Sequence, residues 1–156
     1  MKILIFSDSH GKIKHMDKVF KKHMDITTIF FLGDFITDCN GLFGSDISLY
    51  AVPGNCDFSY NSSTEKTLKI EDKRIWLTHG DGLGVKNSYD MLIISAKQRK
   101  ADICCFGHTH IADSFFKDGI HFINPGSCSY PRGRLGASYA VLELTPSEVL
   151  VKIIEI

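Results

Sequence analysis

The sequence has few of the features that assign a chain to a special class. It has four prolines, five cysteines at irregular spacing and no apolar run long enough to cross a membrane. Its 18 basic residues balance 18 acidic ones, so no overall charge favours nucleic acid or an anionic membrane surface. The odd number of cysteines argues against a disulfide framework, and the first apolar run ends too early for a signal peptide. We therefore expect reduced thiols and a cytoplasmic location.

The length and composition of the chain are those of an ordinary globular protein. The chain has 156 residues, of which 44% are hydrophobic and 23% charged. This length is enough to bury a substantial core. No linker, repeat or low-complexity tract divides the chain, so we expect a single domain over residues 1–156.

Apolar periodicity predicts both helices and strands. The expected helices cover residues 12–24 and 89–100, the second with Ser88 as its N-cap. The expected strands cover residues 2–6, 29–32, 50–52, 67–70, 74–77, 103–106, 112–117, 120–123, 137–144 and 149–156. Strands and helices alternate in the first two-thirds of the chain, and strands dominate the last third. This order predicts an α/β fold, a four-layer sandwich of two mixed β-sheets flanked by helices.

Five short motifs directly follow apolar, strand-like runs. They cover residues 7–10, 31–34, 53–57, 78–81 and 107–110. Between them they carry seven side chains able to bind a metal: Asp8, His10, Asp34, Asn55, His79, His108 and His110. In open α/β sheets ligands gather at the carboxyl ends of strands, so residues far apart in sequence can converge there. Two pairs, Asp8/His10 and His108/His110, are two residues apart, and in an extended segment such residues point the same way.

The residue types favour a metal site. Carboxylates, imidazoles and an amide carbonyl suit Mn²⁺, Fe²⁺, Zn²⁺ or Ni²⁺. A structural zinc site would more often use cysteines paired at short spacing. Cys104 and Cys105 are adjacent instead, which predicts one core cysteine on each face of a strand. We interpret the five motifs together as one two-metal hydrolytic site.

At these motifs the chain resembles the calcineurin-like metallophosphoesterase superfamily, most of all its small single-domain bacterial and archaeal phosphodiesterase branch. The resemblance extends to the segment at residues 124–127, Asn-Pro-Gly-Ser. It implies that one metal is held by Asp8, His10 and His110. It implies that the second is held by Asn55, His79 and His108, and that Asp34 bridges the two.

The resemblance also implies a reaction. A metal-bridging hydroxide would attack a phosphate diester in line, with no covalent phospho-enzyme. Asp34, Asn55 and His79 would be the catalytic residues. Mn²⁺ is the metal we expect first, with Ni²⁺, Zn²⁺ or Fe²⁺ as alternatives. The expected substrate is a small-molecule phosphodiester, with neither nucleic acid nor a membrane as partner, and the habit of small members to associate implies a homo-oligomer.

Several residues outside the ligand set carry further expectations. Many members of the superfamily have a histidine where this chain has Cys56, so we expect weak protonation of the leaving group and faster hydrolysis of aryl than of alkyl diesters. Asp57 and Asp81 are expected to orient ligands from behind, although a plain turn residue is an equal alternative for Asp81. Arg132 is expected to clamp substrate oxygens, with a surface loop as the alternative.

The three remaining histidines favour structural roles. His15 and His23 fall on a lysine-rich helix, where we expect them to be solvated, and His121 alternates with apolar strand neighbours.

Two other functions stay open. The first is an interaction scaffold with decayed metal chemistry, like the retromer subunit of the same branch. All seven ligand positions are intact here, and buried charges without a cation would be costly, which argues against it. The second is a nuclease, against which the neutral charge and the lack of an added binding domain both argue.

Overall fold

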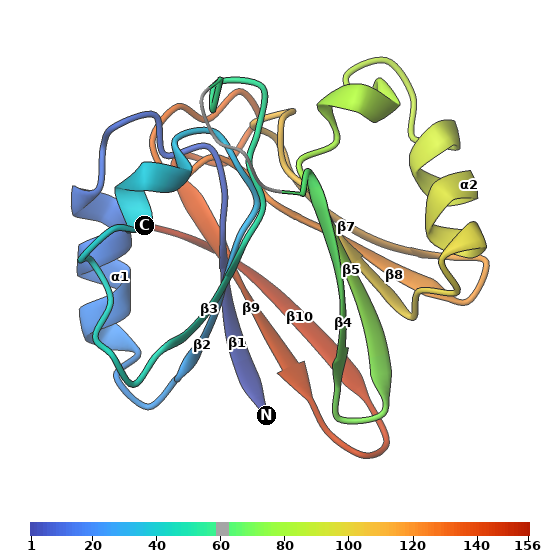
Figure 1. The fold of residues 1–156 in the computed structure, drawn as a ribbon, viewed down its shortest axis with the longest axis horizontal. Helices are drawn as coiled ribbons and strands as arrows, with labels where there is room; N and C mark the ends of the chain where they lie inside the picture. The colour runs from blue at the N-terminus through green and yellow to red at the C-terminus, as the bar shows by residue number, and fades with distance from the viewer. Residues whose placement is uncertain (59–62) are drawn as a thin grey trace.

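Two mixed β-sheets packed face to face form the centre of the fold. The computed structural model describes residues 1–58 and 63–156. In these residues each sheet has five strands, and one α-helix covers the outer face of each sheet (Figure 1). This arrangement confirms the expected sandwich of four layers.

The first sheet has the strand order β10-β9-β1-β2-β3. β1, β2 and β3 are parallel, whereas β9 and β10 add to β1 as an antiparallel pair. The bounds are β1 Lys2–Phe6, β2 Thr28–Phe31, β3 Ser48–Ala51, β9 Ser138–Leu144 and β10 Val149–Glu155.

The second sheet has the order β4-β5-β6-β8-β7, with β5, β6 and β8 parallel and an antiparallel strand at each edge. The bounds are β4 Glu65–Ile70, β5 Lys73–Thr78, β6 Ile103–Cys105, β7 Ala112–Lys117 and β8 Ile120–Pro125. The helices are α1 Lys14–Lys22 on the first sheet and α2 Asp90–Gln98 on the second, with short 3₁₀ turns η1 Ile36–Cys39 and η2 Asp81–Leu83.

The central strands are buried on both faces, which explains their unbroken apolar runs. In β1, Ile3 and Ile5 pack between the sheets, whereas Leu4 packs under α1. The adjacent cysteines of β6 divide in the same way. Cys105 lies between the sheets and Cys104 lies under α2, as predicted.

Both predicted helices are present, and both are shorter than expected. In α2, Leu92 and Ala96 are buried as predicted. Ser88 is not the N-cap, because the helix begins after Tyr89, but its hydroxyl accepts the Asp90 N–H at 3.1 Å. The helix α1 ends at Lys22, because the His23 N–H turns back to the Phe20 carbonyl in a tight last turn. Met24 therefore lies beyond the helix and is 79% exposed.

Two histidines expected to be solvated are partly buried and hydrogen-bonded. His15 Nδ1 lies 2.7 Å from the Cys128 carbonyl oxygen, and His23 Nε2 lies 2.9 Å from the Tyr139 hydroxyl. Both contacts come from segments more than 100 residues away in the sequence, so the helix periodicity gave no sign of them. The ring of His121 packs against Phe116, in agreement with a structural role.

Among the described residues, none of the helices has both the length and the hydropathy that crossing a bilayer requires.

Candidate metal centre

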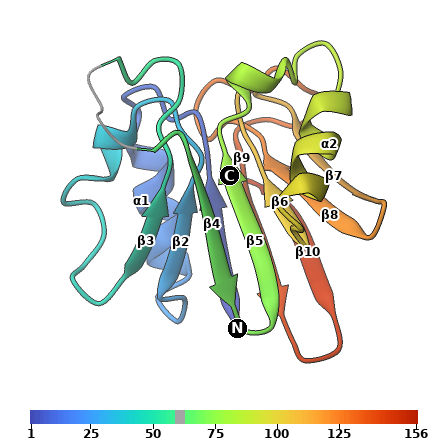
Figure 2. The ribbon, with the colours of Figure 1, turned by 45° about the vertical axis from the view of Figure 1, so that its right-hand side comes forward.

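The five motif loops meet at one end of the sandwich, where the parallel strands of both sheets finish (Figure 2). Hydrogen bonds join neighbouring loops. The Asp8 N–H donates to the Gly33 carbonyl at 3.0 Å, and the Gly107 N–H donates to the His79 carbonyl at 3.0 Å. The His108 N–H donates to Asp8 Oδ2 at 3.2 Å, which connects the loops of the two sheets.

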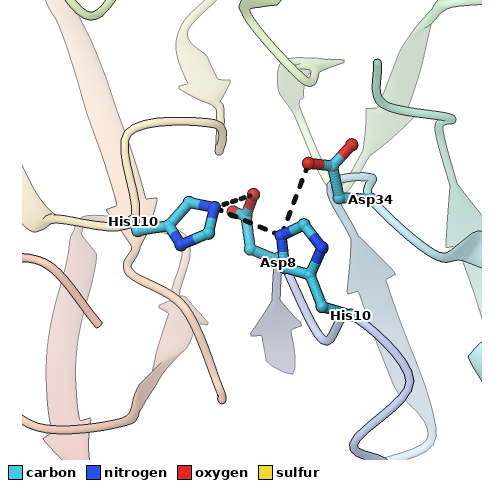
Figure 3. A group of neighbouring side chains, drawn as sticks. All are labelled: Asp8, His10, Asp34 and His110. Atoms are coloured by element: carbon cyan, nitrogen blue, oxygen red, sulfur yellow. Dashed lines mark hydrogen bonds and ion pairs between the residues drawn. The ribbon is translucent and has the colours of Figure 1, made fainter. Parts of the chain in front are cut away.

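Six of the predicted ligands form two groups that share one residue. The first group is Asp8, His10, Asp34 and His110, and the second is Asp34, His79 and His108. Within each group the candidate ligand atoms lie within 4.8 Å of one another. Figure 3 shows the first group, with side chains from three separate loops pointing into a common space. Asp34 is the shared residue, and it lies between the two groups.

The distances within the groups suit ligands of a common ion. In the first group, His110 Nε2 lies 3.2 Å from both His10 Nε2 and Asp8 Oδ1, and His10 Nε2 lies 3.5 Å from Asp34 Oδ2. In the second, His79 Nε2 lies 3.4 Å from Asp34 Oδ1 and 3.2 Å from His108 Nδ1. Two ligands that are each about 2.1 Å from one metal lie roughly 3–3.5 Å apart. Asp34 thus directs one carboxylate oxygen into each group.

Two of the histidines are held in one tautomer. His79 Nδ1 lies 2.6 Å from the Leu32 carbonyl oxygen, and His110 Nδ1 lies 2.7 Å from the Tyr130 carbonyl oxygen. A carbonyl can only accept, so Nδ1 donates in both rings. In the neutral form of each ring, Nε2 then has a free lone pair that faces the site, which is the usual arrangement of a metal-binding histidine.

One atom of Asp8 lacks the partner that its charge requires. The residue is fully buried, and its Oδ2 accepts from the Ser7 hydroxyl as well as from the His108 N–H. Within residues 1–58 and 63–156, Oδ1 has no hydrogen-bond partner. His110 Nε2 is near but carries no proton in the tautomer described above. A buried carboxylate oxygen without a partner is costly, and a cation would satisfy it. The donor set and this orphaned oxygen therefore fit a divalent metal.

The electrostatics differ between the ligands. Burial alone would lower the pKa of His79, but the hydrogen bond to Asp34 and the charges of Asp8 and Asp34 raise it, so a metal that binds this ring displaces a proton from it. Burial alone would raise the pKa of Asp34, but the hydrogen bond and charge of His79 and the Cys56 N–H hold that pKa well below its usual range. Burial lowers the pKa of His10, and burial together with the charge of His79 lowers the pKa of His108. These two rings are consequently neutral at neutral pH, as metal ligation requires.

The seventh predicted ligand, Asn55, lies on a loop that touches the second group. The Cys56 N–H donates to Asp34 Oδ1 at 2.8 Å, and a Cβ atom at Gly54 would collide with the Asp34 carboxylate and the His79 ring. The Asn55 side chain itself is exposed, and its amide nitrogen lies 3.4 Å from the Cys56 sulfur. The loop therefore reaches the site, while the amide contacts its neighbour.

Asp57 and Asp81, the two residues expected to orient ligands, differ in their contacts. Asp57 Oδ1 accepts the Ile36 N–H and Oδ2 accepts the Gly54 N–H, both at 2.8 Å. It thus joins the loop that carries Asp34 to the loop of Asn55. Asp81 is exposed at the start of η2, and in the described part of the chain no hydrogen bond links its carboxylate to His79.

Arg132 lies beside the first group. Its backbone N–H donates to the His110 carbonyl at 3.0 Å, and its exposed side chain lines a pocket together with His10 and His110. A side chain at this position can reach a substrate bound at the first group.

Three buried or partly buried polar residues that we did not single out support the ligand loops. The Asn124 amide donates to the Gly107 carbonyl at 2.9 Å and to the Thr109 hydroxyl at 3.0 Å. The Ser127 hydroxyl donates to the Asp8 carbonyl at 2.7 Å, and Ser129 donates to the carbonyls of Asp8 and Ser9. In the sequence, only the resemblance draws attention to residues 124–127. The signal that could have predicted their supporting role is a set of polar residues at the end of an apolar strand.

The expectation that the pairs Asp8/His10 and His108/His110 converge because their segments are extended is wrong. Asp8, His10, His108 and His110 have φ values of +56°, +47°, +67° and +60°, so these segments are not extended. His108 and His110 also join different groups, because the bend between them turns one ring toward His79 and the other toward Asp8. Tight left-handed turns, rather than strand alternation, bring the ligands together.

Comparisons with known proteins point to a family of phosphoesterases. A profile of the calcineurin-like phosphoesterase superfamily domain matches residues 1–147. The probable metallophosphoesterase YsnB of Bacillus subtilis is 35% identical over 154 residues, covering 97% of this chain and 89% of its own length. The phosphodiesterase YfcE of Escherichia coli is 32% identical over 102 residues, which cover 60% of this chain and 51% of that protein.

Solved structures show the same architecture. The crystal structure of a conserved protein of Streptococcus pneumoniae, described as a predicted phosphoesterase, has a TM-score of 0.86 at 27% identity and covers 99% of this chain and 88% of its own. Vps29 of Entamoeba histolytica, solved in complex with zinc, has a TM-score of 0.77 at 20% identity and covers 99% of both chains. At that identity, the likeness to Vps29 shows the fold alone.

Proposed function

Because the chain belongs to the calcineurin-like phosphoesterase superfamily, we propose that it is a metal-dependent phosphodiesterase with a dinuclear centre. The observation that carries this proposal is the position of Asp34, which contributes one oxygen to each of two ligand groups. A single metal would need no such shared residue. Mn²⁺ is the ion we propose first. The mixed oxygen and nitrogen donors do not fix the metal, and they also accept Ni²⁺, Zn²⁺ or Fe²⁺.

The first ion would be held by Asp8, His10 and His110, and the second by Asn55, His79 and His108, with Asp34 between them. When bound, two such ions supply activation of the attacking water and neutralisation of charge on the phosphate.

The protein's own groups position the reactants. The carbonyls of Leu32 and Tyr130 fix the rings of His79 and His110, and Asp57 holds two ligand loops at one spacing. Asp81 is proposed to act only through its negative charge. Burial and the charge of His79 lower the pKa of His108, and the charge of Asp81 offsets part of that lowering. Arg132 is proposed to bind a phosphate oxygen beside the first group.

The residue after Asn55 limits which leaving groups the site suits. Cys56 follows Asn55 at the position of the missing histidine, and burial together with the charge of Asp34 raises the pKa of its thiol to about 11. A thiol with so high a pKa is a weak acid near neutral pH, so it gives little help to a poor leaving group. Diesters with good leaving groups, such as aryl alcohols, are therefore the substrates that this site suits.

A panel of diesters and monoesters, assayed with Mn²⁺, Ni²⁺, Zn²⁺ or a chelator, tests the proposal. We expect diester turnover that needs metal and that falls at least about 100-fold in Asp34→Asn, since one ion loses its oxygen ligand and both lose the negative charge between them. The exposed Asp46→Asn is the matched control and should keep its activity. Turnover of monoesters but not diesters would reject the diester assignment.

Two other outcomes of the same panel would favour the alternatives. If no metal supports turnover, the interaction scaffold is the better function. A preference for polynucleotides would favour the nuclease. A small-molecule substrate, a cytoplasmic location and a homo-oligomer remain our proposals, and size-exclusion chromatography with light scattering tests the last of them.

A further inference from the structure

A second pocket adjoins the metal centre. It has a volume of about 460 Å³, and its lining includes Thr109, which lies between the proposed ligands His108 and His110. A neighbouring pocket of about 560 Å³ contains His10 and His110. Arg132 lines both, so one arginine stands between the metal centre and the second pocket.

The lining of the second pocket is positively charged. It includes Lys86 and Arg132 and, among the described residues, no carboxylate. Both cations are exposed. Lys97 and Arg99 on the nearby helix are paired with Asp118 and Glu65. Over residues 1–58 and 63–156, no ion pair or side-chain hydrogen bond engages Lys86 or Arg132, so their charges are available to a ligand.

Another part of the pocket's lining forms an apolar wall that is well supported. The Tyr89 ring stacks on Phe115 at a centroid distance of 5.3 Å and meets the edge of Phe106 at 5.2 Å. The buried Val85 and the exposed Ile111 complete this wall. Since packed aromatic rings fix the wall, the pocket is formed before any ligand enters.

We propose that the second pocket binds a further phosphate group of the substrate, so that the substrate is a small phosphodiester carrying a second phosphate. This inference rests on the proposed function of the metal centre. The diester would lie at the metal centre and the second phosphate at Lys86, with Arg132 between the two phosphates and able to donate to both. An apolar part of the substrate would lie against Tyr89. The carboxylate of Asp113 lies close to the Tyr89 side chain, where burial and the charge of Asp113 raise the pKa of Tyr89 to about 12, but Asp113 does not line the pocket. Since no carboxylate in the described part of the chain pairs with Lys86 or Arg132, these two cations suit a doubly charged terminal phosphate better than a neutral group.

The test uses two dinucleotides that differ only in a terminal phosphate. Dithymidylate and its 5′-phosphorylated form compete with bis(4-nitrophenyl) phosphate for the metal-loaded protein, and the inhibition constant of each is measured. We expect the phosphorylated form to have an inhibition constant about tenfold lower, with the difference shrinking as salt is added. Equal constants would overturn the proposal.

Variants locate the effect. In Lys86→Gln we expect the preference to fall to about twofold or less, and in Lys86→Glu the unphosphorylated dinucleotide should bind better. Lys22→Gln removes the same charge at the far end of α1 and should retain the tenfold preference. A tenfold preference that survives in Lys86→Gln would mean that the phosphate binds elsewhere, and the proposal would be wrong.

Failure of the metal centre's proposed function is recognised separately. If bis(4-nitrophenyl) phosphate is not hydrolysed with any metal, that function fails, and titration calorimetry then measures the dissociation constants of the same two dinucleotides. A tenfold preference that Lys86→Gln removes would still support the phosphate pocket. Equal dissociation constants would reject it.

Discussion

The contact most open to a quantitative test is the one that Asp57 makes between two ligand loops. Its carboxylate accepts the N–H groups of Ile36 and Gly54, each at 2.8 Å. The first follows Asp34 by two residues and the second precedes Asn55. Replacement of Asp57 by alanine removes both acceptors and leaves two backbone donors to find water or remain unpaired.

The expected loss of stability follows from these two bonds. A hydrogen bond to a charged acceptor contributes about 1.5–3 kcal/mol, but Asp57 is only partly buried, so water replaces some of that. We expect the free energy of unfolding to fall by about 2–3 kcal/mol in Asp57→Ala, or roughly 5–10 °C in Tm for a chain of this size. Asp57→Asn retains one acceptor oxygen and should lose about half as much.

The same change should weaken metal binding, because the spacing of the two loops sets the spacing of the ligands. Loss of a partner behind a metal ligand typically lowers metal affinity about 10–100-fold. Urea unfolding in the presence of a chelator measures the stability term without a contribution from bound metal. Titration calorimetry with Mn²⁺ then measures the affinity.

The exposed Asp46→Ala serves as the control, since the Asp46 carboxylate accepts a hydrogen bond from the neighbouring Ser45 hydroxyl and joins no distant loops in the described part of the chain. It should change the free energy of unfolding by no more than about 0.5 kcal/mol. If Asp57→Ala is as stable as this control, the two hydrogen bonds do not hold the loops together. If it is less stable but binds Mn²⁺ as well as the parent chain, Asp57 supports the fold and not the metal centre.

Three further predictions concern the same end of the molecule. Gly54→Ala should lower metal affinity at least about tenfold in a calorimetric titration, because the new Cβ collides with the Asp34 carboxylate and the His79 ring. Gly44→Ala is the control: its Cβ meets open space, and it should bind the metal as the parent chain does. Arg132→Ala should raise KM severalfold with little change in kcat in a steady-state assay of an aryl diester, and an unchanged KM would remove Arg132 from substrate binding. Aryl diesters should be hydrolysed at least about 100-fold faster than alkyl diesters, and Cys56→His should narrow that gap by restoring a proton donor; equal rates in the parent chain would contradict the weak-acid argument.

Much of the fold was predictable because its central strands are buried on two sides. The apolar runs that contain β1, β2 and β6 stand out from their polar neighbours, and each run ends two residues before a candidate ligand. The ends of the helices were less predictable. Ile13 and Met24 continue the apolar spacing of α1, yet both are exposed, since the sheet beneath reaches only as far as Met16 and Val19.

Contacts between distant segments were beyond the sequence argument. The sequence around His15 does not predict its contact with the Cys128 carbonyl. The sequence around Asp8 does not predict the hydrogen bonds from the hydroxyls of Ser127 and Ser129. These partners become neighbours only when β9 pairs with β1 and returns the chain to its beginning. A local pattern cannot encode a hydrogen bond whose two ends are joined by the topology of a sheet.

The backbone conformation at the metal centre explains why so few residue types occur among its ligands. Among the described residues, nine that are not glycine have positive φ, and five of them are proposed ligands: Asp8, His10, Asp34, His108 and His110. Such a backbone costs about 1 kcal/mol or more per residue, and Asp, Asn and His accept it several-fold more readily than other side chains. The residue types that bind the metals are therefore also those that tolerate the turns presenting them. Hydrogen bonds from Asn124, Ser127 and Asp57 then hold the strained loops in place, which means that the site is shaped before a cation arrives.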